Sequence, residues 1–94
     1  RPEKQITEKN AGEELIKILK ELKKEPKGDY TITDVKYVAY AEEIDKREGY
    51  TMSIFSSEQE QPTLYFISVT GNIAMQYDDR IGYYYIYGEY TPFG

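Results

Sequence analysis

The chain has 94 residues, with 17 acidic and 12 basic side chains, no histidine and no cysteine, and its formal net charge is −5. This length suits one ordinary domain, and the missing residue types exclude disulfides, thiol nucleophiles, imidazole bases and most transition-metal sites. An acidic chain also lacks the positive surface of nucleic-acid-binding proteins, so no nucleic-acid partner is expected.

Residues 1–10 (RPEKQITEKN) are predicted to be a polar lead-in or linker, because Ile6 is their only aliphatic residue. The chain begins with Arg1 rather than methionine, and we expect a processed or excised piece from which a signal sequence or anchor was removed. Two interpretations stay open: a frayed end, or a tether to a lipid anchor or membrane helix. Residues 11–94 are predicted to form a single domain.

Residues 11–25 are predicted to form a helix. Asn10 is placed to cap it, with Glu13 completing a capping-box-like pair, and Pro26 and Gly28 end it. Its apolar residues recur at helical spacing and predict one buried stripe. The stripe consists of Ala11, Leu15, Ile18, Leu19 and Leu22.

Strand-forming residues occupy most of the remaining chain. Residues 29–44 predict a long strand whose alternation changes phase, so we expect a bulge or bend near Thr33 and Asp34. Residues 45–49 (DKREG) predict a polar turn, and residues 50–56 predict a second strand. Residues 57–62 (SEQEQP) predict an exposed loop that leads into the next strand.

A hairpin is predicted over residues 63–77, with Gly71-Asn72 as a two-residue loop and Thr70 opposite Ile73. Both faces of this hairpin are apolar, unlike those of a sheet with one solvated face. One face carries Leu64, Phe66, Ser68, Ile73, Met75 and Tyr77. The other carries Tyr65, Ile67, Val69, Ala74 and Gln76.

The last predicted strand begins at Ile81, after a tight turn at Asp78-Asp79-Arg80. Its odd positions are Ile81, Tyr83, Tyr85 and Tyr87, and its even positions are Gly82, Tyr84, Ile86, Gly88 and Tyr90. Tyrosine combines an apolar ring with a hydroxyl that can stay hydrated, so the strand can bury one row and display the other. The two glycines suggest a bulge, a bend or a close backbone approach.

This order of elements predicts an α+β domain. We expect one N-terminal helix packed on a curved antiparallel sheet of four to five strands, connected as a meander. The helix has one apolar stripe and can cover only one sheet face. The second apolar face would then be used by another copy or another protein, or be buried by curling of the sheet itself.

The segments GYTMSI (residues 49–54) and VTGNI (residues 69–73), with this order of elements, resemble PepSY-type and cystatin-like domains over roughly residues 11–77. That resemblance implies a small extracytoplasmic binding or regulatory module, of the kind often found in lipoproteins and membrane-protein ectodomains. The inhibitory Gln-Val-Gly loop of cystatins is absent, and residues 77–90 have no counterpart in the simpler PepSY pattern. The resemblance therefore transfers no functional residue.

The acidic residues do not predict a catalytic or metal site. Asp78 and Asp79 suit a turn and lack the spacing of an EF-hand. A second acidic group consists of Glu42, Glu43, Asp45 and Glu48. Adjacent carboxylates at a strand end point to opposite faces rather than across a cleft, so a solvated turn is the better interpretation of this group. No phosphate-binding glycine motif occurs, and we expect no cofactor and no enzymatic activity.

Tyrosine is the one residue type in excess, with 11 among 94 residues, and it is enriched at recognition surfaces. It is also an ordinary strand residue, so an entirely structural role stays open. The candidate partner-binding residues are Tyr83, Tyr84, Tyr85, Tyr87 and Tyr90.

The leading functional hypothesis is a non-enzymatic binding or accessory domain of a bacterial surface protein or lipoprotein. Its aromatic sheet face would engage a protein partner or a second copy of the domain as a homodimer. The location would be extracytoplasmic, with an anchor in a segment absent here and no direct membrane insertion, since no apolar stretch approaches about 20 residues. The alternative is a cytoplasmic, acidic inhibitor or immunity-type protein that masks a basic partner with residues 42–48 and 58–60.

Overall fold

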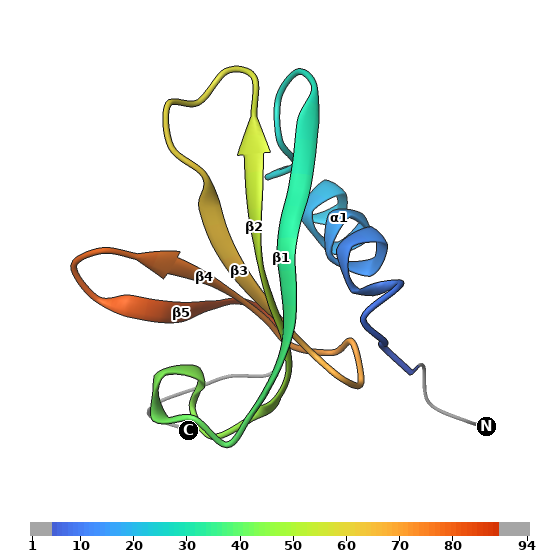
Figure 1. Cartoon of the computed structure of the whole chain (residues 1–94), viewed down its shortest axis with the longest axis vertical. Helices are drawn as coiled ribbons and strands as arrows, with labels where there is room; N and C mark the ends of the chain where they lie inside the picture. The colour runs from blue at the N-terminus through green and yellow to red at the C-terminus, as the bar shows by residue number, and fades with distance from the viewer. Residues whose placement is uncertain (1–4, 89–94) are drawn as a thin grey trace.

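The computed structural model describes residues 5–88. These residues form one α-helix, a short 3₁₀ helix and five strands. In chain order they are α1 (Ala11–Glu21), β1 (Tyr30–Ala39), η1 (Glu42–Ile44), β2 (Glu48–Ser56), β3 (Thr63–Ser68), β4 (Ala74–Asp78) and β5 (Gly82–Tyr87). The strands pair antiparallel in the order β1-β2-β3-β4-β5 (Figure 1). The predicted α+β class and the meander connection are therefore confirmed.

Helix α1 packs on one face of the sheet, which we call the helix-side face. Leu15 and Leu19 are fully buried in a cluster with apolar residues of β2, β3 and β4. The strand residues of this cluster are Met52, Ile54, Tyr65, Ile67 and Ala74. Gly12 lets the helix approach β1 closely, because a Cβ atom there would lie 2.9 Å from Ile32 Cδ1. The apolar stripe predicted for this helix thus supplies the larger of two cores.

The helix ends four residues before the predicted boundary, at Glu21. Its last turn closes as a Schellman motif, in which Lys24 N donates to Leu19 O (2.8 Å) and Lys23 N donates to Lys20 O (3.1 Å). Lys23 adopts the left-handed conformation at φ 60°, in the place where glycine is usual. The prediction that Pro26 would end the helix was wrong because backbone hydrogen bonds had already closed it.

The predicted cap at the start of the helix was also wrong. The Asn10 side chain makes no capping hydrogen bond. Its Oδ1 instead accepts from Thr7 N (2.7 Å), within a turn that precedes the helix. Asn10 therefore stabilises the approach to the helix rather than its first turn.

Ile6, within the expected lead-in, packs against the domain. The Ile6 side chain is buried in the main core, and Ile6 N donates to Val69 O (2.8 Å). A single aliphatic residue within a polar segment thus joins the chain before the helix to the loop between β3 and β4.

Strand β1 contains the predicted bulge. Its register with β2 shifts between Thr33 and Lys36, and Asp34 lies in the left-handed region at φ 58°, which aspartate tolerates better than most residues. The strand ends at Ala39 rather than at Ile44, because Tyr40 has φ 66° and turns the chain out of the sheet. The predicted bulge is confirmed, and the predicted C-terminal boundary was wrong.

The hairpin of β3 and β4 has the predicted faces but a register shifted by two residues. Phe66 lies opposite Met75, and the same register places Ser68 opposite Ile73. The loop therefore consists of the four residues 69–72 instead of two. Ser68 Oγ accepts from Ile73 N (3.1 Å), and Ser68 O accepts from Gly71 N (2.9 Å). Because a two-residue shift preserves the side-chain period, every residue of the hairpin keeps its face.

A second bulge alters the alternation of β5. The register with β4 shifts between Ala74 and Met75, and both Ile86 and Tyr87 pack against the core under α1. Gly88 follows at φ 104°, where a Cβ atom would lie 2.1 Å from Asn72 O. The glycine thus permits a close backbone approach, as expected for one of the two glycines in this strand.

Replacing Lys23 by glycine should stabilise the protein by about 1 kcal/mol, because a left-handed residue with a Cβ atom is strained. The matched change Lys20→Gly, inside the helix, should instead destabilise it by about 1 kcal/mol. Urea unfolding followed by circular dichroism measures both free energies of unfolding. A loss of stability in Lys23→Gly would contradict the described helix end.

Candidate functional site

The face of the sheet opposite α1, here called the second face, is covered over part of its area by η1 and the loop around it. Ile44 of η1 is only 1% exposed and packs in a second buried cluster with strand residues. Those residues are Phe66, Ile73 and Met75. Tyr83 and Tyr85 pack against the same cluster from β5. The molecule therefore has a small core on each side of its sheet.

This cover comes from a segment whose sequence predicted only a strand end and a polar turn. The loop is closed by Tyr40 N donating to Arg47 O and Lys46 N donating to Ala41 O, both at 2.8 Å. Asp45 and Lys46 adopt left-handed backbone conformations that return the chain to β2. Ile44 is thereby turned onto the sheet, a cover for the second face that the sequence patterns did not predict.

The cover is incomplete. Three large side chains on the second face remain exposed, with exposed fractions of 45% for Phe55, 37% for Leu64 and 37% for Tyr77. Leu64 lies opposite Ser53 of β2, and the ring of Tyr77 meets that of Tyr83 edge to face at 5.1 Å between centroids. These apolar groups lie on the part of the face that η1 does not reach.

Two adjacent cavities mark this region, and Tyr83 lines both of them. The first, of about 230 Å³, lies between β1 and β5 and is lined by Asp34, Lys36, Thr51, Met52, Ser53, Leu64 and Tyr83. The second, of about 240 Å³, lies beside η1 and is lined by Glu42, Glu43, Asp45, Met75, Tyr83, Tyr84 and Tyr85. We call the two together the sheet hollow.

The structure distributes the candidate tyrosines between both faces. Tyr83 and Tyr85 contact the cluster on the second face, and Tyr87 packs on the helix-side core. Tyr84 lies opposite Gln76 and also lines the sheet hollow. Tyr90 lies outside the described residues. Three of the five candidates thus meet at one cavity.

Hydrogen bonds hold Tyr85 in place. Its hydroxyl donates to a carboxylate oxygen of Asp45 and accepts from Arg47 Nε at 3.0 Å. The Arg47 guanidinium also lies 5.3 Å from the centroid of the Tyr85 ring, within cation–π range. Burial and the hydrogen bond to Asp45 raise the pKa of Tyr85. This tyrosine therefore joins the η1 loop to β5 and serves as a fixed wall of the hollow.

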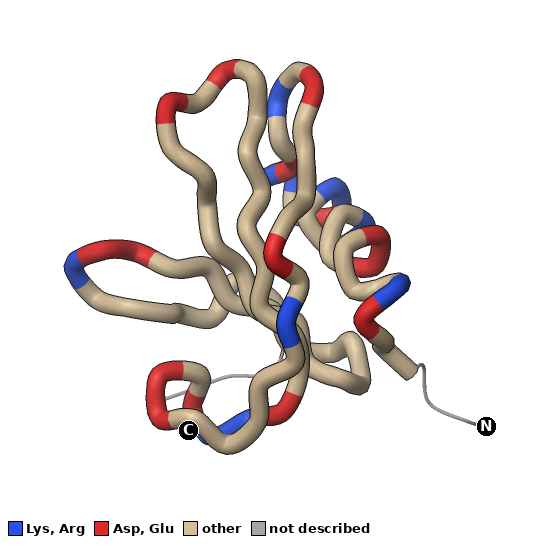
Figure 2. Tube along the Cα trace, in the orientation of Figure 1, with Lys and Arg blue, Asp and Glu red and all other residues tan. Residues whose placement is uncertain are grey.

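Acidic groups surround the cavity beside η1. Glu42 is paired with Lys46 at 3.4 Å and both are exposed, whereas Glu43 lies close enough to Tyr83 to contribute, after burial, to the raised pKa of that phenol. Figure 2 shows acidic segments along the η1 loop and at the tips of the β2–β3 and β4–β5 loops. Between residues 29 and 88 there are ten acidic and four basic side chains, so the sheet and its connecting loops carry a net negative charge.

The turn at Asp78 has a structural explanation. Asp78 Oδ1 accepts from Arg80 N at 2.7 Å, and Ile81 N donates to Asp78 O at 3.2 Å. The hydrogen bond from the Arg80 backbone lowers the pKa of this carboxyl. Within residues 5–88, no group of three or more acidic side chains is arranged to hold a metal ion.

Comparisons with known proteins do not identify a relative: no family model, no curated protein and no solved structure matches this chain. The helices formed by residues 5–88 include none with the length and apolar character needed to span a bilayer. The functional argument consequently depends on the geometry of the chain itself.

Sequence reasoning identified Tyr83, Tyr84 and Tyr85 but missed the contribution of η1. An isolated isoleucine within an acidic turn carries a weak signal, and the contact of Ile44 with β3 and β4 is non-local. The excess of apolar residues on two sheet faces was the one indication that a second cover was required.

Replacing Ile44 by alanine should destabilise the protein by about 2–4 kcal/mol, because a fully buried side chain on the second face would leave a cavity. The matched control is Ile81→Ala, since Ile81 is 69% exposed and should change stability by no more than about 0.5 kcal/mol. Chemical denaturation compares the two variants. Equal effects would show that Ile44 does not pack on the sheet.

Stability should fall as the pH rises above about 10, the ordinary pKa of tyrosine. Burial, followed by the charge of Glu43, raises the pKa of Tyr83 in the folded state. The neutral phenol thus stabilises the fold fully below the unfolded pKa, and that contribution is lost as the pH rises through the folded pKa. Urea unfolding at pH 7 and pH 11 measures how much of the free energy of unfolding is lost between the two pH values. That loss should be smaller for Tyr83→Phe than for the unmodified chain, and identical losses would contradict a raised pKa of Tyr83 in the folded state.

Proposed function

We propose that this chain is a non-enzymatic binding domain that engages a protein partner through the sheet hollow. One observation carries the proposal: Ile44 covers only part of the second face of the sheet, and Phe55, Leu64 and Tyr77 remain exposed on that face. Exposed large apolar side chains are typical of interaction surfaces, and one of these three, Leu64, lines the sheet hollow. Tyr83 and Tyr85 supply aromatic walls of low conformational entropy.

The proposal includes the sheet curvature and the helix packing expected from the sequence. A sheet that curls around its second face would bring Tyr83 of β5 toward Asp34 and Lys36 of β1, and these three residues line one cavity. A partner inserted there would contact four strands at once. The binding surface would therefore depend on the fold of the whole sheet rather than on one loop.

Charge determines the kind of partner that we propose. The cavity beside η1 is lined by Glu42, Glu43 and Asp45 and by no basic residue, so a segment carrying lysine or arginine beside an apolar side chain suits it best. The alternative function, an intracellular acidic inhibitor or immunity-type protein that masks a basic partner, would use the same carboxylates. The aromatic and the acidic hypotheses therefore converge on one surface.

We propose an extracytoplasmic location for the domain, on the resemblance of its element order to PepSY-type and cystatin-like modules. Attachment to a bacterial surface through a lipid or membrane anchor outside this chain belongs to the same proposal. A cytoplasmic location belongs to the alternative function.

The binding proposal can be tested with a library of fluorescent ten-residue peptides that pair one lysine or arginine with one aromatic residue. We expect some of them to bind with micromolar to submillimolar dissociation constants and to lose affinity as salt is added. Leu64→Ser should weaken binding about tenfold, while Ile81→Ser, an equally apolar change on the exposed β4–β5 turn, should not.

Sedimentation equilibrium of the same chain decides whether the partner is a second copy. Association that Leu64→Ser abolishes would identify the sheet hollow as a homodimer interface. A monomer that binds none of the peptides, or binding that Leu64→Ser leaves unchanged, would contradict the proposed function.

A further inference from the structure

Two tyrosine rings are in contact on the helix-side face, where β1 forms the edge of the sheet. Tyr37 of β1 lies opposite Tyr50 of β2, and their rings meet edge to face with 5.7 Å between centroids. Since Tyr40 N donates to Arg47 O, the alternation of the ladder makes Tyr37 and Tyr50 a non-hydrogen-bonded pair, the kind whose side chains approach most closely. Tyr37 is 54% exposed, whereas Tyr50 packs against the main core. We call these two residues the β1–β2 tyrosine pair.

A carboxylate accepts the phenolic proton of the exposed ring. The Tyr37 hydroxyl donates to a carboxylate oxygen of Glu48. This hydrogen bond is the main cause that raises the pKa of Tyr37 to about 12, so the phenol keeps its proton at neutral pH. Glu48 forms no ion pair within residues 5–88, and the side chain of the adjacent Arg47 contacts Tyr85 instead. Glu48 is therefore available to take up the proton that Tyr37 would lose on oxidation.

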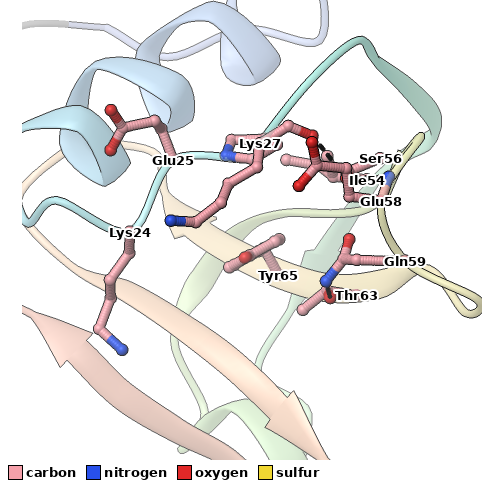
Figure 3. Close-up of a pocket in the computed structure, with 10 residues that line it drawn as sticks. Lys24, Glu25, Lys27, Ile54, Ser56, Glu58, Gln59, Thr63 and Tyr65 are labelled. Atoms are coloured by element: carbon pink, nitrogen blue, oxygen red, sulfur yellow. Dashed lines mark hydrogen bonds between the residues drawn. The ribbon is translucent and has the colours of Figure 1, made fainter.

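Few other kinds of side chain in this protein are open to an oxidant. The chain has no cysteine, tryptophan or histidine. Its two methionines, Met52 and Met75, are each 2% exposed, so the usual targets of protein oxidation are absent or shielded. Tyr65 is also shielded, because it is only 7% exposed and lines a pocket with Lys27 and Gln59 at the end of α1 (Figure 3). Oxidation is therefore directed to the exposed tyrosines.

A second tyrosine pair has a similar ring geometry without the proton acceptor. Tyr77 and Tyr83 meet edge to face at 5.1 Å, but within the described part of the chain neither hydroxyl forms a hydrogen bond. Tyr85 does donate to Asp45, yet the Arg47 guanidinium lies against its ring and donates to its hydroxyl. A fixed positive charge opposes the removal of an electron from that ring. The β1–β2 tyrosine pair thus combines ring contact, exposure and a carboxylate acceptor.

We propose that the β1–β2 tyrosine pair is a site of oxidative cross-linking, at which a haem peroxidase and hydrogen peroxide join Tyr37 and Tyr50 as dityrosine. The oxidant removes one electron from each phenol, while the proton of Tyr37 passes to Glu48 and that of Tyr50 to water. A carbon–carbon bond then forms between the ring positions next to the two hydroxyls, and the hydrogen on each of these carbons moves to the oxygen. The pair loses two hydrogen atoms in all, and one hydrogen peroxide becomes two water molecules.

The cross-link would bind the edge strand β1 covalently to β2 in a chain that has no cysteine to do so. A covalent bond between two strands restricts the unfolded chain, as a disulfide does, so the oxidised protein should unfold at a higher urea concentration. This site lies on the helix-side face and is independent of the sheet hollow.

The test is to treat the whole chain at low concentration with a haem peroxidase and hydrogen peroxide, and to map the products by trypsin digestion and mass spectrometry. We expect a fluorescent monomer that is lighter by two hydrogen atoms, with peptide 37–46 joined to peptide 48–80. Fragmentation of the joined peptides identifies the linked tyrosines. Coupling of Tyr77 to Tyr83 would instead join peptide 48–80 to peptide 81–94. A monomer cross-linked mainly there, or products that are only intermolecular, would overturn the proposal.

Variants separate the role of Glu48 from simple exposure. Tyr37→Phe should abolish the cross-link, whereas Tyr40→Phe, which removes a phenol that is 70% exposed, should leave it unchanged. Glu48→Gln keeps an oxygen that accepts the hydrogen bond but takes up no proton, so the cross-link should form about tenfold more slowly. Coupling of Tyr77 to Tyr83 is the internal control and should keep its rate. An unchanged rate in Glu48→Gln would contradict the proposal, and the map of the unmodified chain decides the matter even where a variant fails to fold.

Discussion

A five-stranded sheet with apolar side chains on both faces has two surfaces to remove from water, and this chain has only one α-helix among its described residues. The helix buries the larger surface with a regular apolar stripe. On the other face a three-residue 3₁₀ helix inserts a single isoleucine, Ile44, above Phe66 and Met75. The area that this small cover leaves open is where Phe55, Leu64 and Tyr77 are exposed. The proposed binding surface is thus a direct consequence of how the second face is covered.

The same shortage of cover explains the position of the tyrosines. Tyr83 and Tyr85 lie at the boundary between the covered and the open parts of the second face. Their rings contribute apolar area to the small core, and the Tyr85 hydroxyl is held by Asp45 and Arg47 of the covering loop. Tyrosine suits such a boundary because one end of its side chain is apolar and the other polar. The rigid walls that result would bind a partner with little loss of side-chain entropy.

Local patterns in the sequence predicted the α+β class, the antiparallel strands, the bulge near Asp34 and the faces of the β3–β4 hairpin. These patterns failed where residues far apart in the sequence are in contact, or where the backbone adopts an unfavourable conformation. The helix ends early because Lys23 accepts a left-handed backbone that sequence preference assigns to glycine. The hairpin loop is longer because Ser68 Oγ takes the Ile73 N–H, and the burial of Ile6 and Ile44 depends on non-local contacts. Of the candidate site, the tyrosines were predictable from composition, whereas the placement of Tyr87 on the helix-side face depended on the bulge in β5.

The most direct test of the account is the solvent exposure of side chains on the second face of the whole chain, measured by NMR with a soluble paramagnetic agent at low protein concentration. The account predicts strong attenuation of the Leu64 and Phe55 signals and protection of the Ile44 and Phe66 signals, because η1 covers only part of the face. Equal protection of Leu64 and Ile44 in a monomer would contradict it. In that case another part of the chain would cover the hollow, and no surface for a partner would remain on this face.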